Sequence, residues 1–113
     1  MNFQHKQLAE KNWVKLSFFQ QMANIGSEVE RTIIWENKKN HLYGQKAIKR
    51  ALELLFLTIA DSKNRHRLKE LTRLHEVLID YFFGQNQYSS SNRLWQKYFY
   101  AFTYLSRVNV KSS

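Results

Sequence analysis

Apolar residues recur every three or four positions along most of the chain, which is the spacing of one face of an α-helix. This period predicts a helix over residues 8–38. Gly26 lies inside it, where it either lets another helix come close or marks a break, with Ser27 capping a second segment. The apolar positions of this helix are Leu16, Phe19, Met22, Ala23, Gly26, Val29 and Ile33.

Three further helices are expected, each bounded by residues that commonly begin or end helices. Asn40 is placed as one N-cap, Gly84 as a stop, and Ser90 or Ser91 as the last N-cap. The expected helices cover residues 41–60, 65–83 and 92–108.

These elements predict an all-α fold, in particular an antiparallel four-helix bundle with up-down topology. The length of 113 residues fits a single domain over residues 1–113, with residues 1–7 and 109–113 expected to fray. The composition agrees, because the chain has no Pro and only three Gly, whereas sheets and loop-rich folds depend on such turn residues.

Several kinds of chemistry lack the residues that they need. The chain has no Cys, which excludes disulfides, Cys-based zinc sites and thiol nucleophiles. The histidines, at positions 5, 41, 66 and 75, have no i, i+4 spacing and no matched carboxylate, so no metal site is expected. No Gly-rich loop that could cradle a phosphate is present either, and no cofactor is expected. The sequence shows no secretory signal and no run near the ~18 apolar residues of a membrane span. We therefore expect a soluble, cytoplasmic protein without a membrane partner.

The 41–60 helix is apolar on nearly all sides when its residues are placed at about 100° each. In so small a domain no helix is easily covered all round by its own chain. The pattern therefore predicts a homo-oligomer, with an interface that includes Leu52, Phe56 and Leu57.

The stretch "NRHRLKELTRLHEV", residues 64–77, combines cations with two histidines. His75 falls within the apolar arc of the 65–83 helix, so it is expected to be a core histidine with a hydrogen-bond partner. The opposite face is expected to be a solvated surface of ion pairs. The arc contains Leu68, Leu71, Leu74, Leu78, Ile79 and Phe82, and the charged face contains Lys69, Arg73, Glu76 and Asp80.

Small all-helical HEPN-type proteins cleave RNA with an Arg that is followed by His after four to six residues. The chain resembles them in size and helix content, but Arg67 and His75 have seven residues between them. Arg73 and His75 point to nearly opposite sides of the helix and would not hold one phosphate together. A HEPN-type ribonuclease or toxin–antitoxin subunit remains an alternative.

The 92–108 helix carries the clearest functional pattern. Its expected core face is Leu94, Trp95, Tyr98, Phe102 and Leu105, and a second row lies opposite at spacings of four and three. Cations that meet phosphates, interleaved with Tyr rings that stack on bases, suit single-stranded nucleic acid. Packing of the two Tyr rings against a neighbour is the competing interpretation. The row is Arg93, Lys97, Tyr100, Tyr104, Arg107 and Lys111.

Charge supports a polyanionic partner. The net charge is +9, and no acidic residue follows Asp80. A basic surface attracts phosphates and gains from the release of their counterions. Lys46, Lys49 and Arg50 are expected to contribute to the same binding surface.

The passages "SFFQQMANIGSEVERTIIW", "KAIKRALELLFLTIAD" and "WQKYFYAF" are similar to those of small bacterial helical-bundle proteins. In helix order, charge and size the chain also resembles the accessory variability proteins of diversity-generating retroelements. That resemblance implies a basic four-helix bundle that assembles into rings and binds a reverse transcriptase and its RNA. It implies no particular functional residue.

Together these patterns predict a non-catalytic adaptor that binds nucleic acid, with RNA favoured over DNA. The adaptor is expected to self-associate and to work beside a larger enzyme such as a reverse transcriptase. Besides the HEPN-type alternative, a protein-interaction bundle with an acidic protein partner stays open.

Overall fold

The computed structural model describes residues 10–109, and this part of the chain contains helices and no strand. A short helical stretch at residues 10–14 comes first. The longer elements are α2 (Phe18–Asn37), α3 (His41–Ala60), the 3₁₀ helix η1 (Ser62–Arg67), α4 (Leu68–Phe83) and α5 (Asn92–Asn109). The predictions for residues 1–7 and for residues 110–113, which include Lys111, fall outside the described residues, whereas Asn109 belongs to α5.

The first long helix begins later than expected. Residues 15–17 interrupt the helix expected over 8–38, and α2 starts at Phe18 after the N-cap Ser17. The Ser17 hydroxyl accepts a hydrogen bond from the Gln20 backbone N–H at 3.1 Å, and the Gln20 side chain accepts one from the Ser17 N–H at 2.9 Å. This capping box fixes the start of the helix. The alternative of a break near Gly26, with Ser27 as a cap, is wrong, because α2 is continuous from Phe18 to Asn37.

Gly26 has the other role considered for it, the close approach of a second helix. α2 runs through it without interruption, and the residue is buried. A Cβ atom at this position would lie 2.6 Å from the Cβ of Phe99 on α5, too close for two carbon atoms. The absence of a side chain at Gly26 thus allows α5 to pack against α2.

The other joints follow the expected capping residues. Asn40 accepts a hydrogen bond from the Tyr43 N–H at 3.1 Å and starts α3, which covers the expected residues 41–60. Ser91 accepts from the Leu94 N–H at 3.1 Å at the start of α5. α4 ends before Gly84, as expected. It begins three residues late, because residues 62–67 form η1, with Asp61 as its N-cap.

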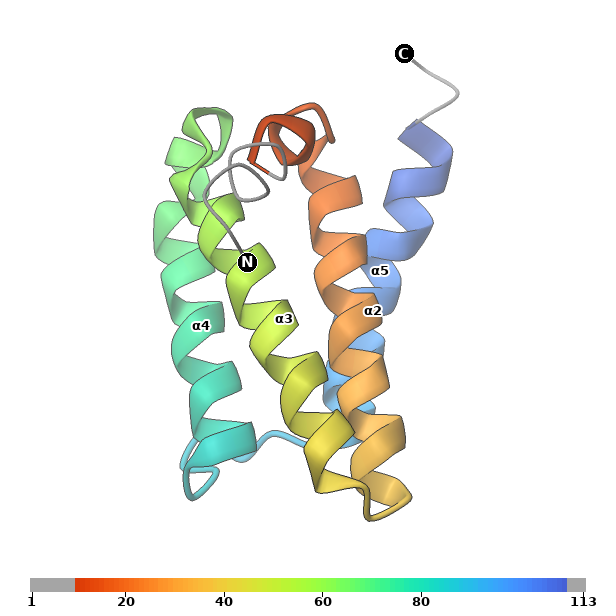
Figure 1. Ribbon diagram of the computed structural model, residues 1–113. Coiled ribbons are helices and arrows are strands. Elements are labelled where there is room, and N and C mark those ends of the chain that lie inside the picture. The colour runs from red at the N-terminus through yellow and green to blue at the C-terminus, as the bar shows by residue number, and fades with distance from the viewer. Residues whose placement is uncertain (1–9, 110–113) are drawn as a thin grey trace.

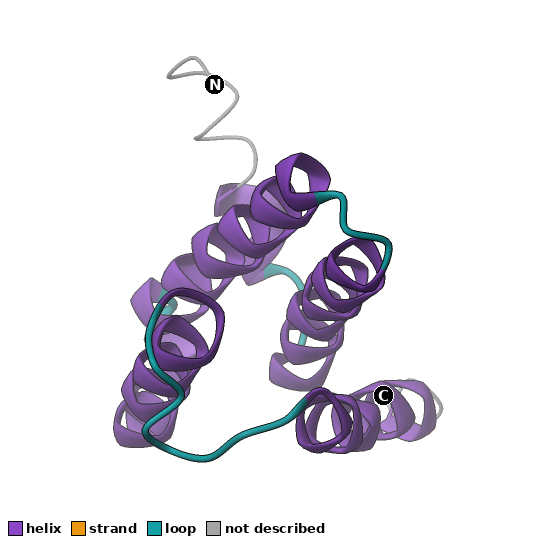
Figure 2. Ribbon diagram, turned by 90° about the horizontal axis from the view of Figure 1, so that it is seen from below, coloured by secondary structure: helices purple, strands orange, loops and turns teal. Residues whose placement is uncertain are grey.

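The four long helices lie side by side in the order α4, α3, α2, α5 (Figure 1). α2 packs against both α3 and α5, while the loop at residues 84–91 runs from α4 across to α5 (Figure 2). Side chains also join α4 to α5, since the Tyr81 hydroxyl donates to Asn92 Oδ1 at 2.6 Å. The apolar core draws on all four helices, and its most enclosed members are Met22, Ile25, Leu55, Leu71 and Leu78.

A buried polar network closes the end of the molecule where α3 meets η1. Gln21 donates to Asp61 Oδ2 at 2.9 Å and to the Trp13 carbonyl at 3.0 Å. Asn64 donates to Gln21 Oε1 and to the Thr58 carbonyl, both at 2.9 Å. Trp13 Nε1 donates to the Thr58 hydroxyl at 3.0 Å. Because each of these polar groups is bonded, the network fixes residues 13–21 against the end of α3 without an unpaired buried group.

Candidate nucleic-acid interface

α5 is the outer helix beside α2, and its sequence divides it into a buried side and an exposed side. Trp95 and Phe99 are buried, while Tyr98 and Phe102 are half-buried against the core. The expected core face was partly wrong, because Leu94 is 53% exposed and Phe99 was missed. Gly26 explains the difference, since it admits Phe99 rather than Leu94 to the contact with α2.

The exposed side of α5 carries the row of cations and tyrosines that the spacing predicted. Tyr100 is 70% exposed and Tyr104 is 58% exposed, so neither ring packs into the core of its own chain. Both rings are free to stack on a partner. The cations of this row, Arg93, Lys97 and Arg107, are exposed as well.

The row is also free of neutralising partners on its own helix. α5 contains no acidic residue, and none of its residues takes part in an ion pair within residues 10–109. The row from residue 93 to residue 107 spans about 21 Å by the helical rise. It therefore presents unpaired positive charge and aromatic faces along one line.

The cations expected on α3 do not continue this row, because α2 lies between α3 and α5 (Figure 1). Lys46, Lys49 and Arg50 are exposed. Lys46 Nζ lies 5.5 Å from the Tyr43 ring centroid, and an Arg50 nitrogen lies 3.6 Å from a carboxylate oxygen of Glu53. These three residues form a separate basic area.

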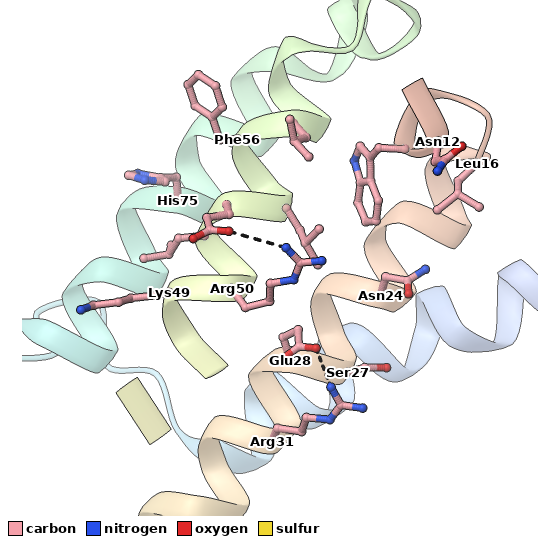
Figure 3. Close-up of a pocket in the computed structure, with 15 residues that line it drawn as sticks. Asn12, Leu16, Asn24, Ser27, Glu28, Arg31, Lys49, Arg50, Phe56 and His75 are labelled. Atoms are coloured by element: carbon pink, nitrogen blue, oxygen red, sulfur yellow. Dashed lines mark hydrogen bonds and ion pairs between the residues drawn. The ribbon is translucent and has the colours of Figure 1, made fainter. Parts of the chain in front are cut away.

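The sequence-predicted oligomer residues line a hollow of about 1060 Å³ between α2 and α3, named here the α2–α3 hollow. Leu52 and Leu57 are half-buried in it, and Phe56 is 64% exposed. Figure 3 shows the Arg50–Glu53 pair on the α3 wall and the Arg31–Glu28 pair, at 2.6 Å, on the α2 wall. The hollow thus has an apolar floor and charged walls.

Arg31 on α2 is a residue that sequence reasoning did not assign to a site. It lines both the α2–α3 hollow and a second hollow of about 560 Å³ between α2 and α5, named here the α2–α5 hollow. Ser27 and Arg31 point from α2 toward the side where α5 runs (Figure 3). Their i, i+4 spacing was the signal available in the sequence.

His75 is not the core histidine that was expected. It is exposed and lies at the edge of the α2–α3 hollow (Figure 3). The buried arc of α4 is narrower than its apolar arc, because Leu71, Leu74 and Leu78 are buried whereas Leu68 is 46% exposed. Arg67 is turned the other way, with its guanidinium 4.0 Å from the centroid of the Phe18 ring. The geometry does not bring Arg67 and His75 to one phosphate.

On the charged face of α4, Lys69, Arg73 and Glu76 are exposed and Asp80 is half-buried, and within the described chain the four do not form ion pairs with one another. Three of them, Arg73, Glu76 and Asp80, contact the loop before α5 instead. Asp80 accepts from the backbone N–H of Gln87 at 2.9 Å and of Tyr88 at 3.0 Å. The Arg73 guanidinium lies 4.7 Å from the Tyr88 ring centroid, and the Tyr88 hydroxyl donates to Glu76 at 3.3 Å. The face therefore positions the loop that leads into α5.

Among residues 10–109, three groups have shifted pKa values, and none lies in the α5 row. Burial and the negative charge of Glu70 raise the pKa of Tyr98 to about 12. Burial also raises the pKa of Tyr81. At Asp61 burial would raise the pKa, but hydrogen bonds from Lys63 and Gln21 outweigh it and hold the pKa below its ordinary value. These shifts belong to core groups rather than to an acid–base site.

No three His, Asp or Glu side chains among residues 10–109 are grouped so that they could hold a metal ion. No helix in that range is both long and apolar enough to cross a membrane.

Comparisons of the chain with protein-family models, with curated proteins and with solved structures gave no match. The function therefore has to follow from the geometry of the surfaces described above.

Proposed function

We propose that this protein is a non-catalytic adaptor that binds single-stranded nucleic acid, RNA in preference to DNA, along the exposed side of α5. The observation that carries the proposal is the row of Arg93, Lys97, Tyr100, Tyr104 and Arg107, exposed and without an acidic residue on the same helix.

The two residue types in the row contribute in different ways. The cations neutralise phosphates and release counterions, which makes the affinity fall as salt rises. The Tyr rings stack on bases, at about 1–3 kcal/mol each, and they need bases whose faces are open. Bases in a duplex are already stacked, so the pairing of Tyr100 with Tyr104 one turn away favours a single strand.

Self-association is the second part of the proposal. The α2–α3 hollow, with the exposed Phe56 beside Leu52 and Leu57, is the surface that a second copy would cover. Exposed apolar area of this kind commonly marks an interface.

We also propose that the four long helices form an up-down, antiparallel four-helix bundle. The short joints and the helix order support this topology (Figure 1). We further propose that the protein is cytoplasmic.

A larger enzyme is the third part. The resemblance to the accessory variability proteins implies a reverse transcriptase as this partner. In this proposal RNA binds on α5 and a second copy binds at the α2–α3 hollow, so the two binding surfaces lie on different helices. Such a separation is what an adaptor requires.

Fluorescence anisotropy with a short labelled single-stranded RNA tests the binding surface. The variant Arg93→Glu/Lys97→Glu/Arg107→Glu should lose at least a hundredfold in affinity at low salt. A charge-matched control, Lys38→Glu/Lys39→Glu/Lys69→Glu, changes exposed cations on other parts of the chain and should lose much less. Equal losses in the two variants would mean that net charge, and not α5, governs binding.

The tyrosines give a sharper test at constant charge. Tyr100→Ala/Tyr104→Ala should lose roughly tenfold or more, because stacking is removed. Tyr100→Phe/Tyr104→Phe retains both rings and should bind like the wild type.

RNA cleavage distinguishes the adaptor from a HEPN-type ribonuclease. An adaptor should leave the same RNA intact after long incubation, whereas a ribonuclease should cleave it. Binding of an acidic protein but of no nucleic acid would favour the protein-interaction alternative.

A further inference from the structure

The α2–α5 hollow lies directly beside the cationic row. Gln96, Tyr100 and Thr103 line it from α5 at spacings of four and three, which places them on one face of that helix. Glu30 and Arg31 line it from α2. A ligand moiety in the hollow would therefore have the exposed Tyr100 ring on one side and the Glu30 carboxylate on the other.

Glu30 carries a negative charge, which a surface that binds only phosphates would not be expected to contain. It is half-buried, and among the described residues it forms no ion pair, whereas the adjacent Arg31 is paired with Glu28. Its Oε1 accepts a hydrogen bond of 3.2 Å from Gln96 Nε2. A carboxylate repels phosphate, but it accepts strongly from N–H groups, and one oxygen of Glu30 has no partner in this contact.

The two side chains together match the edge of one base. Gln96 has a second amide N–H to donate, and the Glu30 carboxylate presents two acceptor oxygens. The Watson–Crick edge of guanine offers an acceptor, O6, next to two donors, N1–H and N2–H₂. Adenine, cytosine and uracil do not present two adjacent donors on this edge, so they cannot satisfy both carboxylate oxygens.

We propose that the α2–α5 hollow binds one unstacked guanine base of a single-stranded nucleic acid. Tyr100 stacks on the ring, Gln96 donates to O6, and Glu30 accepts from N1–H and N2–H₂. Unstacked bases in single strands are recognised in this way, by an aromatic face together with hydrogen bonds to the base edge. The inference rests on the proposed function, since the neighbouring cations of α5 hold the phosphates on either side of the base.

Anisotropy with four RNAs tests the inference. Each is a twelve-residue oligouridine that carries guanosine, inosine, adenosine or uridine at one central position. The guanosine RNA should bind about tenfold more tightly than the adenosine and uridine RNAs, the discrimination expected of one bidentate contact. Inosine lacks the N2 amino group and should fall between them.

Two isosteric variants locate the effect. Glu30→Gln should abolish the guanosine preference without weakening the binding of the all-uridine RNA, because one negative charge is removed from a phosphate-binding surface. Glu28→Gln is the matched control, since Glu28 lies on the same helix and pairs with Arg31, and it should keep the preference. A preference that persists in Glu30→Gln overturns the guanine site.

The proposed function and this inference fail in different ways. If the four RNAs bind equally well and the triple Glu variant of α5 binds none of them, the adaptor stands and the guanine site falls. If the wild type binds no RNA or single-stranded DNA at low salt, both fall.

Discussion

Asn64 Nδ2 donates a hydrogen bond of 2.9 Å to Oε1 of Gln21, and both side chains are almost wholly buried. The pair joins η1 to the first turns of α2, two segments that lie 43 residues apart in the chain. Gln21 in turn reaches Asp61, and Asn64 reaches the end of α3. This pair thus lies at the centre of a buried network in which α2, the end of α3 and η1 meet.

Removing the Asn64 side chain should be costly. Asn64→Ala leaves Gln21 Oε1 buried without a donor, and such an unpaired group costs about 1–3 kcal/mol, whereas the Thr58 carbonyl keeps the Asp61 backbone N–H at 3.3 Å. We expect the free energy of unfolding to fall by about 1–3 kcal/mol in urea denaturation. Asn24→Ala is the control, because Asn24 is exposed and bonds only to the Gln20 carbonyl; its change should stay within about 0.5 kcal/mol.

The Asp61 carboxylate should make the protein sensitive to acid. Its pKa in the folded chain is below the ordinary value of 3.8, so protonation favours the unfolded chain. The stabilisation is fully present above pH 3.8 and is lost as the pH falls through the lowered pKa. Asp61→Asn should show a smaller loss of unfolding free energy between pH 5 and pH 2. An identical acid profile in the variant would contradict this role.

Gly26→Ala should destabilise the fold although Ala is the better helix former. The new methyl group would overlap the Cβ of Phe99, which is attached to the backbone of α5 and cannot turn away. We expect a loss of about 1–3 kcal/mol in the free energy of unfolding. Gly44→Ala is the matched helical control, because the group nearest to its new methyl is the far end of the Glu36 side chain, which can rotate away where a backbone-attached Cβ cannot. That variant should be neutral or more stable by up to about 1 kcal/mol.

Asp80→Ala should release the loop between α4 and α5. The backbone N–H groups of Gln87 and Tyr88 lose a charged acceptor, so their hydrogen exchange should become at least tenfold faster. Glu76→Ala removes only an exposed 3.3 Å contact with the Tyr88 hydroxyl and should leave exchange nearly unchanged. Similar acceleration in both variants would show that Asp80 does not hold the loop.

Phe56→Glu should disrupt self-association. The ring is 64% exposed beside the α2–α3 hollow, and a carboxylate there would be costly to bury against a second copy. Light scattering at high micromolar concentration should show an oligomer for the wild type and a monomer for the variant. Leu42→Glu alters an equally exposed residue of α3 that does not line the hollow, and it should remain oligomeric. A monomeric wild type would rule out the proposed interface.

The sequence predicted the elements well wherever the signal was local. Asn40, Gly84 and Ser91 bound helices as expected, because a cap acts within three or four residues of itself. The break at Ser17 was missed although "SFFQ" is a capping-box sequence. The apolar period continues across it from Leu16 to Phe19, and periodicity alone does not register a change of helix direction.

Predictions that depended on distant neighbours were less successful. Periodicity placed His75 within an apolar arc, but the width of the buried arc depends on how α3 packs against α4. The partners of Asp80 lie in the following loop, and the Gln21–Asn64 bond joins remote segments. The exposed row on α5 was predictable, whereas Arg31 and Glu30 beside it depend on which helix packs against α5.

The contact at Gly26 has a consequence for related chains. Because a side chain at position 26 and the ring at position 99 compete for one space, the two positions should change together during evolution. A homologue with Ala or Ser at position 26 should carry a smaller residue at position 99, or have α5 shifted along α2. In the second case the row of cations and tyrosines would move with the helix, so covariation at this pair would also indicate which homologues keep that row in the same place relative to α2.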